Sequence, residues 1–388
     1  MKKIFFLLVL FSLILFSCSL KVSKRDSIPI RYDGYLYLDV QLESKIHGNF
    51  VFDTGAPVLI IDSLFCKNNQ LDYRTTKVKI NGIGNASKIA QMITDTIRYK
   101  FENKEYCYNS SLALIFDLKS MVGENIDGIL GAKTFAQKTY MLDYVSQNII
   151  FTDYAEGYVV INSLFEDDRI YLPLTITLKN GKKISGMFLL DTGSDQTILN
   201  NFAYMTDGIH NSTYKKKFIA NGGIGGDSNG YFLPIKEINI GEFKLKNVIT
   251  CVSNDTLGML ANTDYIGIIG NDILDDFNII FDHQKEKIWV KPNKNFDKNK
   301  SRMFRSISIK QSENKWIIAG IVEDTDAYKN GIRMNDQILE IDNVPVEKIE
   351  LKKFVNKMKP NDVMLLKIKQ GSEEREVKFK LDFFIKTD

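Results

Sequence analysis

The chain has 388 residues, of which 44% are hydrophobic and 26% are charged, an ordinary composition for a globular protein. A chain of this length can form two or three domains, each with its own core. The formal net charge of +3 includes two lysines at positions 2 and 3, so a processed chain is nearly neutral. Because nucleic-acid binding usually requires a clustered basic face, we expect no nucleic acid among the partners.

Residues 1–17 are expected to be a targeting signal rather than part of the fold. Two lysines precede an apolar run from Ile4 to Phe16, which is too short to span a bilayer as a helix. The run ends at Leu-Phe-Ser-Cys, which resembles a bacterial lipobox with Cys18 as the lipidated residue. That resemblance implies a membrane partner through the lipid anchor and a location in the cell envelope, with Ser19 favouring the outer membrane. A plain signal peptide with an incidental cysteine is the alternative.

After a polar tether at 18–27, the chain contains two copies of one pattern, an apolar run that ends at Asp-Thr-Gly. The first run ends at Asp53 and the second at Asp191, 138 residues later. Each copy is followed after about 75 residues by an apolar segment that ends in glycine. Short alternating strands separated by turn residues fill both copies. The sequence therefore predicts a mainly β protein with two similar modules, over 28–155 and 165–292.

A polar linker at 293–302 separates these modules from a third pattern. Strands are expected at 316–322, 363–368 and 375–381, and a helix at 351–358, where apolar residues recur at helical spacing. Residues 327–346 resemble the core of PDZ domains in bacterial periplasmic proteases, so a small α+β PDZ-like module is expected over 303–384. The resemblance implies a C-terminal peptide as a ligand. The carboxylate-binding loop near 304–307 lacks the usual glycine, so a packing or docking role stays open.

The paired motifs resemble those of aspartic proteases of the pepsin and retropepsin type. Residues 190–199, Leu-Asp-Thr-Gly-Ser-Asp-Gln-Thr-Ile-Leu, match the retropepsin pattern, and 268–274 resemble the second signature of that family, with Asn271 in place of an arginine. The resemblance implies two β-barrel lobes that face each other and contribute Asp53 and Asp191 to one catalytic pair. In such a pair, which shares one proton, one carboxylate activates water and the other donates to the substrate carbonyl, without a metal or other cofactor.

The resemblance also implies roles for the neighbours of these aspartates. Thr54 and Thr192 are expected to form hydrogen bonds across the lobe interface and to fix the two loops relative to each other. Gly55 and Gly193 lack a side chain, which permits close approach of backbone and substrate to the carboxylates.

The two copies differ in the residues that follow Asp-Thr-Gly. Ser194 is expected to donate to the outer oxygen of Asp191, which Ala56 cannot do for Asp53, so the aspartate pair should be asymmetric. Asp195 matches an acidic residue with which retropepsins hold the substrate backbone, whereas the first copy has Pro57 at this position.

Two glycine-rich turns lie where the family carries flaps that close over the substrate. The first glycine-rich turn is 81–85 and the second is 221–226. An ordinary hairpin turn is an open alternative, above all for the first. The residues expected to contact substrate in these turns are Gly82, Gly84, Gly223, Ile224 and Gly225.

Apart from Cys18, the chain has Cys66, Cys107 and Cys251, which form no metal or disulfide pattern and are expected to be buried or free, although the first two could bridge. We expect a lipid-anchored aspartic endopeptidase that hydrolyses peptides or proteins, for which a monomer suffices. A non-catalytic peptide-binding lipoprotein is the alternative, and a third interpretation treats both Asp-Thr-Gly motifs as structural turns of a duplicated barrel.

Overall fold

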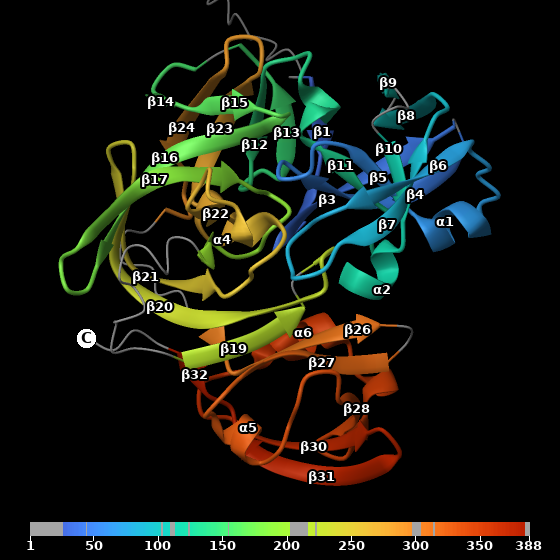
Figure 1. Ribbon diagram of the computed structural model, residues 1–388, viewed down its shortest axis with the longest axis vertical. Helices are drawn as coiled ribbons and strands as arrows, with labels where there is room; N and C mark the ends of the chain where they lie inside the picture. Colours follow the sequence, from blue (N-terminus) through green and yellow to red (C-terminus); the bar gives the residue numbers. More distant parts are fainter. Residues whose placement is uncertain are drawn as a thin grey trace, which may run out of the picture.

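The computed structural model describes residues 26–43, 45–101, 104–108, 113–122, 125–153, 155–201, 216–221, 223–296, 304–312 and 315–384. Strands account for 52% of the residues and helices for 11%, so the expected mainly β fold is confirmed. Figure 1 shows two β lobes side by side above a smaller C-terminal body. The signal segment and Cys18 lie outside the described residues, and none of the described helices is long and apolar enough to cross a membrane.

The first lobe is a sheet in which the strand that ends at Asp53 is central. Its strands are β2 (Arg31–Asp33), β3 (Tyr35–Leu42), β4 (Ile46–Asp53), β5 (Leu59–Asp62), β6 (Thr75–Ile80), β7 (Lys88–Ile93), β8 (Ile97–Phe101), β9 (Lys104–Tyr108), β10 (Ala113–Phe116) and β11 (Gly128–Gly131). Two helices, α1 (Ser63–Asn68) and α2 (Leu118–Val122), accompany them. β11 runs parallel to β4. A side chain at Gly128 would collide with the Phe50 ring, because its Cβ would lie 2.0 Å from a ring carbon.

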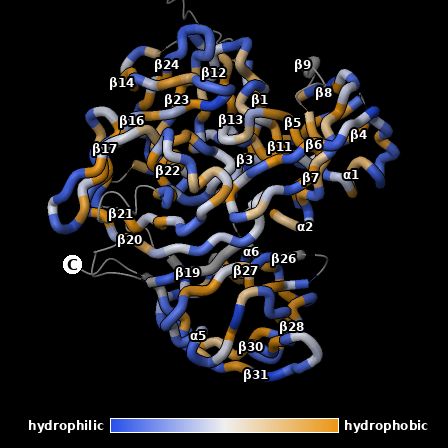
Figure 2. The backbone as a smooth tube through the Cα atoms, in the orientation of Figure 1, coloured by the Kyte–Doolittle hydropathy of each residue, from blue (hydrophilic) through white to orange (hydrophobic). Residues whose placement is uncertain are grey.

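The second lobe repeats this arrangement around the strand that precedes Asp191. Its strands are β15 (Leu164–Glu166), β16 (Arg169–Leu178), β17 (Lys183–Leu190), β18 (Ile198–Leu199), β19 (Lys216–Asn221), β20 (Asp227–Ile240), β21 (Phe243–Ser253) and β22 (Gly267–Ile269). The short helix α4 (Asn271–Leu274) follows β22. β22 runs parallel to β17, as β11 does to β4. Figure 2 shows hydrophobic residues along the strands, whereas the outer turn between β16 and β17 is hydrophilic.

A six-stranded sheet joins the two lobes. It consists of β1 (Ser27–Pro29), β12 (Tyr140–Asp143), β13 (Asn148–Phe151), β14 (Val159–Ile161), β23 (Phe277–Asp282) and β24 (Lys287–Pro292). β12 and β23 are antiparallel neighbours at its centre, where the rings of Tyr140 and Phe281 stack at 4.8 Å. β14 lies between the two predicted modules and pairs with β24. One hydrophobic core extends from Ile28 in β1 to Val290 in β24, so the two lobes share a core.

The C-terminal residues form a body with its own core. Its elements are β25 (Phe304–Arg305), β26 (Ile307–Ser312), β27 (Lys315–Val322), α5 (Asp326–Lys329), β28 (Gln337–Ile341), β29 (Val344–Pro345), α6 (Leu351–Lys357), β30 (Val363–Gln370), β31 (Glu373–Lys380) and β32 (Phe383–Phe384). The strands and the helix that the sequence predicts here are all present. Trp316, Ile338 and Phe379 lie in its core.

An edge of this C-terminal body pairs with the second lobe. β19 and β27 are antiparallel, with Ile219 opposite Ile321, and Lys217 forms an ion pair with Glu323 at 3.1 Å. The Lys310 ammonium also donates to the carbonyl oxygen of Met121 in α2, at 3.2 Å. The C-terminal body therefore contacts both lobes (Figure 1).

The sequence left open whether Cys66 and Cys107 form a disulfide. Cys66 and Cys251 are buried and free, so the alternative in which Cys66 bridges to Cys107 is not realised. Burial raises the pKa of the Cys66 thiol to about 12, with the nearby Asp62 carboxylate as a second cause.

Candidate active site

Asp53 and Asp191 occupy equivalent positions at the ends of two strands. β4 ends at Asp53, which lies opposite Gly131 of the parallel strand β11. Asp191 directly follows β17, and its N–H donates to the carbonyl oxygen of Ile269 in β22 at 3.1 Å. In both lobes, a parallel strand formed by the apolar segment that ends in glycine therefore lies beside the strand that leads to the aspartate.

Four reciprocal hydrogen bonds join the loop that contains Asp53, the first loop, to the loop that contains Asp191, the second loop. The Thr54 N–H donates to Thr192 Oγ1 and the Thr192 N–H donates to Thr54 Oγ1, both at 3.0 Å. The Thr54 hydroxyl donates to the carbonyl oxygen of Leu190, and the Thr192 hydroxyl to that of Phe52, both at 2.7 Å. Both threonines are fully buried. This symmetric set joins the lobes at the point where the carboxyl groups lie.

Each carboxyl group packs against the glycine of the opposite loop. A Cβ on Gly55 would lie 2.6 Å from Cγ of Asp191, and a Cβ on Gly193 would lie 2.2 Å from Cγ of Asp53. The carboxyl groups of Asp53 and Asp191 also hydrogen-bond to each other. The structure thus brings the two predicted aspartates together, and only glycine fits beside them.

Burial raises the pKa of both carboxyls, and for Asp191 the charge of Asp53 raises it further. Backbone donors oppose this effect unequally. Asp53 Oδ1 accepts from the N–H groups of Gly55 at 2.8 Å and Ala56 at 3.0 Å, whereas Asp191 accepts from Gly193 at 2.8 Å. Asp53 is therefore the better stabilised anion, and the shared proton favours Asp191.

The predicted bond between Ser194 and Asp191 is wrong. The Ser194 hydroxyl donates instead to the carbonyl oxygen of Gln196 at 2.7 Å, which closes a tight turn. The asymmetry of the aspartate pair consequently has the opposite origin, because the additional donor, the N–H of Ala56, belongs to the first loop.

Asn271 supports the second loop, a role that the sequence did not predict. This fully buried residue donates through Nδ2 to the carbonyl oxygens of Thr192 and Gly34, both at 2.8 Å. Its Oδ1 accepts from the Tyr144 hydroxyl at 2.8 Å. The only signal was its departure from the arginine of retropepsins.

The two glycine-rich turns meet each other. The first connects β6 to β7, and the second connects β19 to β20. The Gly225 N–H donates to the carbonyl oxygen of Ile83 at 2.7 Å, and a Cβ on Gly82 would lie 2.8 Å from Cβ of Ile224. Gly84 and Gly225 approach so closely that a Cβ on Gly84 would lie 2.5 Å from the Gly225 carbonyl carbon, whereas Gly223 is less tightly packed.

Asp255, which the sequence analysis missed, holds the first turn. This buried carboxylate accepts from the Gly84 N–H at 3.2 Å and from Asn85 Nδ2 at 2.9 Å. It also accepts from the Ser228 hydroxyl in β20 at 2.9 Å. One side chain therefore ties the first turn to the second lobe.

Asp195 is exposed. It lies close to Gly34, the residue before β3, because a Cβ on Gly34 would be 3.9 Å from the Cβ of Asp195. The charge of Asp195 is the largest cause of the raised pKa of the Tyr35 hydroxyl, and the charges of Asp191 and Asp53 raise that pKa further. The structure places Asp195 and Tyr35 together beside the aspartate pair.

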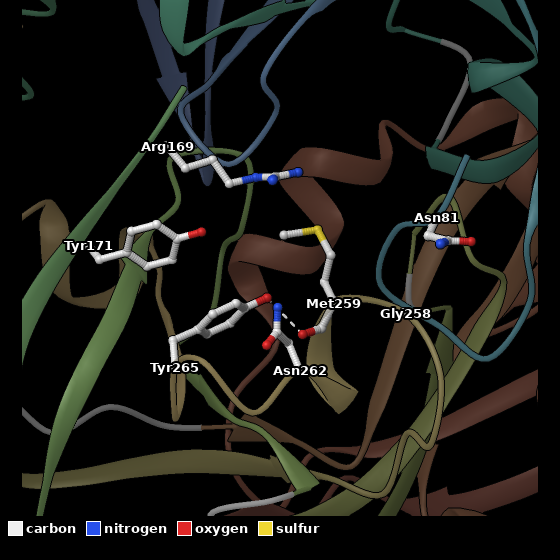
Figure 3. Close-up of a pocket in the computed structure, with 7 residues that line it drawn as sticks. All are labelled: Asn81, Arg169, Tyr171, Gly258, Met259, Asn262 and Tyr265. Atoms are coloured by element: carbon white, nitrogen blue, oxygen red, sulfur yellow. Dashed lines mark hydrogen bonds between the residues drawn. The ribbon is translucent and has the colours of Figure 1, made fainter. Parts of the chain in front are cut away.

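A cavity of about 290 Å³ lies next to the first loop, on the side of the aspartate pair away from Asp195. Arg169 lines it and donates through Nε to the carbonyl oxygen of Gly55 at 3.0 Å. Figure 3 shows its guanidinium directed toward the same space as the hydroxyl groups of Tyr171 and Tyr265 and the Met259 side chain. The positive charge of Arg169 lowers the pKa of both aspartates, although less than burial raises it.

Comparison with known proteins identifies one part of the chain. A family model described as the PDZ domain matches residues 306–381, so the C-terminal body is a PDZ domain, as the sequence predicted. No curated protein matches the chain.

Proposed function

We propose that the chain is an aspartic endopeptidase, a hydrolase that cleaves peptide bonds between its two lobes. The observation that carries the proposal is the pair of buried carboxyl groups that hydrogen-bond to each other and are held by the reciprocal threonine bonds. Burial of two interacting carboxyls is unfavourable for stability, and a structural turn has no need of it.

The mechanism follows from the unequal surroundings of the two aspartates. Asp53, the better stabilised anion, takes a proton from a water molecule between the carboxyls, and the resulting hydroxide attacks the carbonyl carbon of the substrate. Asp191 donates its proton to the carbonyl oxygen as the tetrahedral intermediate forms. General acid–base assistance of this kind contributes about 10²- to 10⁴-fold to a rate. Asp53 then gives its proton to the leaving amine nitrogen as the C–N bond breaks, and Asp191 recovers its proton from a hydroxyl of the intermediate as the product carboxyl group forms.

A non-catalytic peptide-binding protein is the second candidate. The PDZ domain favours it, because PDZ domains typically bind peptide ligands. β26 pairs with β27 along one edge, and no described strand pairs with its other edge. A PDZ peptide ligand is compatible with either candidate.

Cleavage of a denatured protein such as casein by the full chain tests the proposal. Wild type should produce new N-termini, and Asp53→Asn and Asp191→Asn should each lower kcat/KM by at least 1,000-fold, because either change removes one of the two proton-transfer groups. Asp72→Asn, at an exposed position, is the matched control and should retain wild-type activity. Equal cleavage by either active-site variant would exclude the mechanism.

The N-terminal sequence supports a lipid anchor at Cys18 in the cell envelope, with the outer membrane as the proposed location. In cells fed labelled palmitate, the wild-type chain should incorporate label and sediment with membranes. Cys18→Ala should do neither, and label in that variant would contradict the anchor.

A further inference from the structure

The cavity beside the aspartate pair contains a cation that forms no ion pair within the described residues. Arg169 is partly buried, and its Nε bonds to the carbonyl oxygen of Gly55. Within the described ranges no carboxylate lies at ion-pair distance from it, and the neighbouring Asp168 pairs with Lys133 at 2.7 Å instead. Figure 3 shows the guanidinium directed into the cavity.

Two tyrosine hydroxyls line the cavity beside Arg169. The Tyr171 hydroxyl hydrogen-bonds to Arg169. The Tyr265 hydroxyl donates to the carbonyl oxygen of Met259 at 2.7 Å. A guanidinium offers several N–H donors in a planar fork that matches a carboxylate. A carboxylate ligand would supply the ion-pair partner that Arg169 lacks among the described residues.

The strand register shows which residue takes the place of Arg169 in the first lobe. Tyr37 lies opposite Val51 in the β3–β4 pair, and Tyr171 lies opposite Leu189 in the β16–β17 pair. Because Val51 and Leu189 each precede their aspartate by two residues, the two tyrosines are equivalent. Two residues earlier on each strand, Tyr35 therefore corresponds to Arg169.

The loops that face these two residues differ in charge. Tyr35 faces the second loop, whose Asp195 carboxylate is its strongest electrostatic neighbour. Arg169 faces the first loop, where Pro57 occupies the position equivalent to Asp195. The acidic residue that would neutralise Arg169 by symmetry is thus absent from this chain.

We propose that the Arg169 cavity is a specificity subsite that binds the side-chain carboxylate of an aspartate or glutamate in the substrate. This inference rests on the proposed function, since the peptide must lie between the lobes. The acidic residue lies near the scissile bond because Arg169 contacts Gly55, whose N–H binds Asp53. A lysine or arginine at the same substrate position is disfavoured by charge repulsion.

The test is the cleavage of an equimolar peptide library by the full chain at a pH where substrate carboxylates are ionised, with products read by mass spectrometry. Wild type should prefer Asp or Glu over Asn or Gln by at least tenfold at one fixed position from the scissile bond. Arg169→Gln keeps a donor for Gly55 but no charge, so it should lose this preference. Arg169→Glu should turn the preference toward Lys or Arg.

Arg31→Gln is the matched control, because Arg31 is an exposed arginine of the first lobe, 4.1 Å above the Tyr37 ring. It should keep the acidic preference. Cleavage without an acidic preference, or an Arg169→Gln variant that retains it, would overturn the subsite and leave the endopeptidase intact.

Absence of any cleavage would instead count against the proposed function, and binding then decides the subsite. The same library is passed over immobilised full-length Asp191→Asn protein. Enrichment of acidic peptides that is lost when Arg169→Gln is added supports the subsite. Equal retention of acidic and neutral peptides contradicts it.

Discussion

Asp53 and Asp191 belong to identical tripeptides, yet their surroundings make them different acids. Two backbone N–H groups bind Asp53, and one binds Asp191. The charge of Asp53 then adds to burial in raising the pKa of Asp191. Two identical Asp-Thr-Gly motifs can therefore contain carboxyl groups with different pKa values, and a comparison of the motifs alone does not reveal this difference.

The raised pKa of Asp191 predicts how stability depends on pH. The folded protein keeps a proton that the unfolded chain releases near pH 4, so this contribution is complete below about pH 4 and is lost as pH rises toward the folded-state pKa. The loss is about 1.4 kcal/mol per pH unit for one proton. In urea titrations across pH 3–8, Asp191→Asn should reduce this slope and become the more stable protein at pH 7.

The exposed Asp72→Asn serves as the control, since it should follow the wild-type curve at every pH. Parallel curves for wild type and Asp191→Asn would show that the Asp191 carboxyl keeps an ordinary pKa in the folded protein.

Roles tied to the repeated motif were predictable, including the threonine bonds between two distant loops, and roles that depend on which backbone oxygen a side chain reaches were not. Asp53 and Asp191 follow from their motifs. Asn271 and Arg169 bond carbonyl oxygens of distant segments, and Ser194 bonds one that lies two residues away. Sequence patterns do not record which of these oxygens a side chain reaches. The error at Ser194 arose because a family role was assigned without knowledge of that competing acceptor.

At the scale of elements, periodicity predicted the strands, and the repeat predicted the two lobes. The six-stranded sheet was not predicted, because β14 is only three residues long and lies between the modules. The pairing of β19 with β27 was not predicted either. Partner choice between strand edges leaves no period in the sequence, whereas burial of one face does.

The link between the two aspartate loops makes a prediction at this scale. Thr54→Val removes a hydroxyl and leaves the Thr192 N–H and the Leu190 carbonyl oxygen without these partners. Each buried unsatisfied group costs about 1–3 kcal/mol, so urea unfolding should show a loss of about 2–6 kcal/mol. Thr54→Ser keeps the hydroxyl and should lose only about 1 kcal/mol for the methyl group. Equal losses in both variants would mean that packing, rather than the hydrogen bonds, stabilises this junction.

At the scale of the whole molecule, strand pairing connects the two lobes and the PDZ domain. The lobes share one core and one six-stranded sheet. The PDZ domain continues the sheet of the second lobe through β19, which also forms one side of the second glycine-rich turn. A peptide on the unpaired edge of β26 would therefore be separated from the β19–β20 hairpin by β26 and β27.

The most direct test of the aspartate pair is the pH profile of kcat/KM for peptide cleavage by the full chain between pH 3 and 9. Activity requires one protonated and one ionised carboxyl, so the rate should fall at both ends of this range. Because burial raises the pKa of both aspartates, the maximum should lie above pH 4, the ordinary range of an aspartate. A rate that rises steadily to pH 9, or that does not change with pH, would contradict catalysis by Asp53 and Asp191.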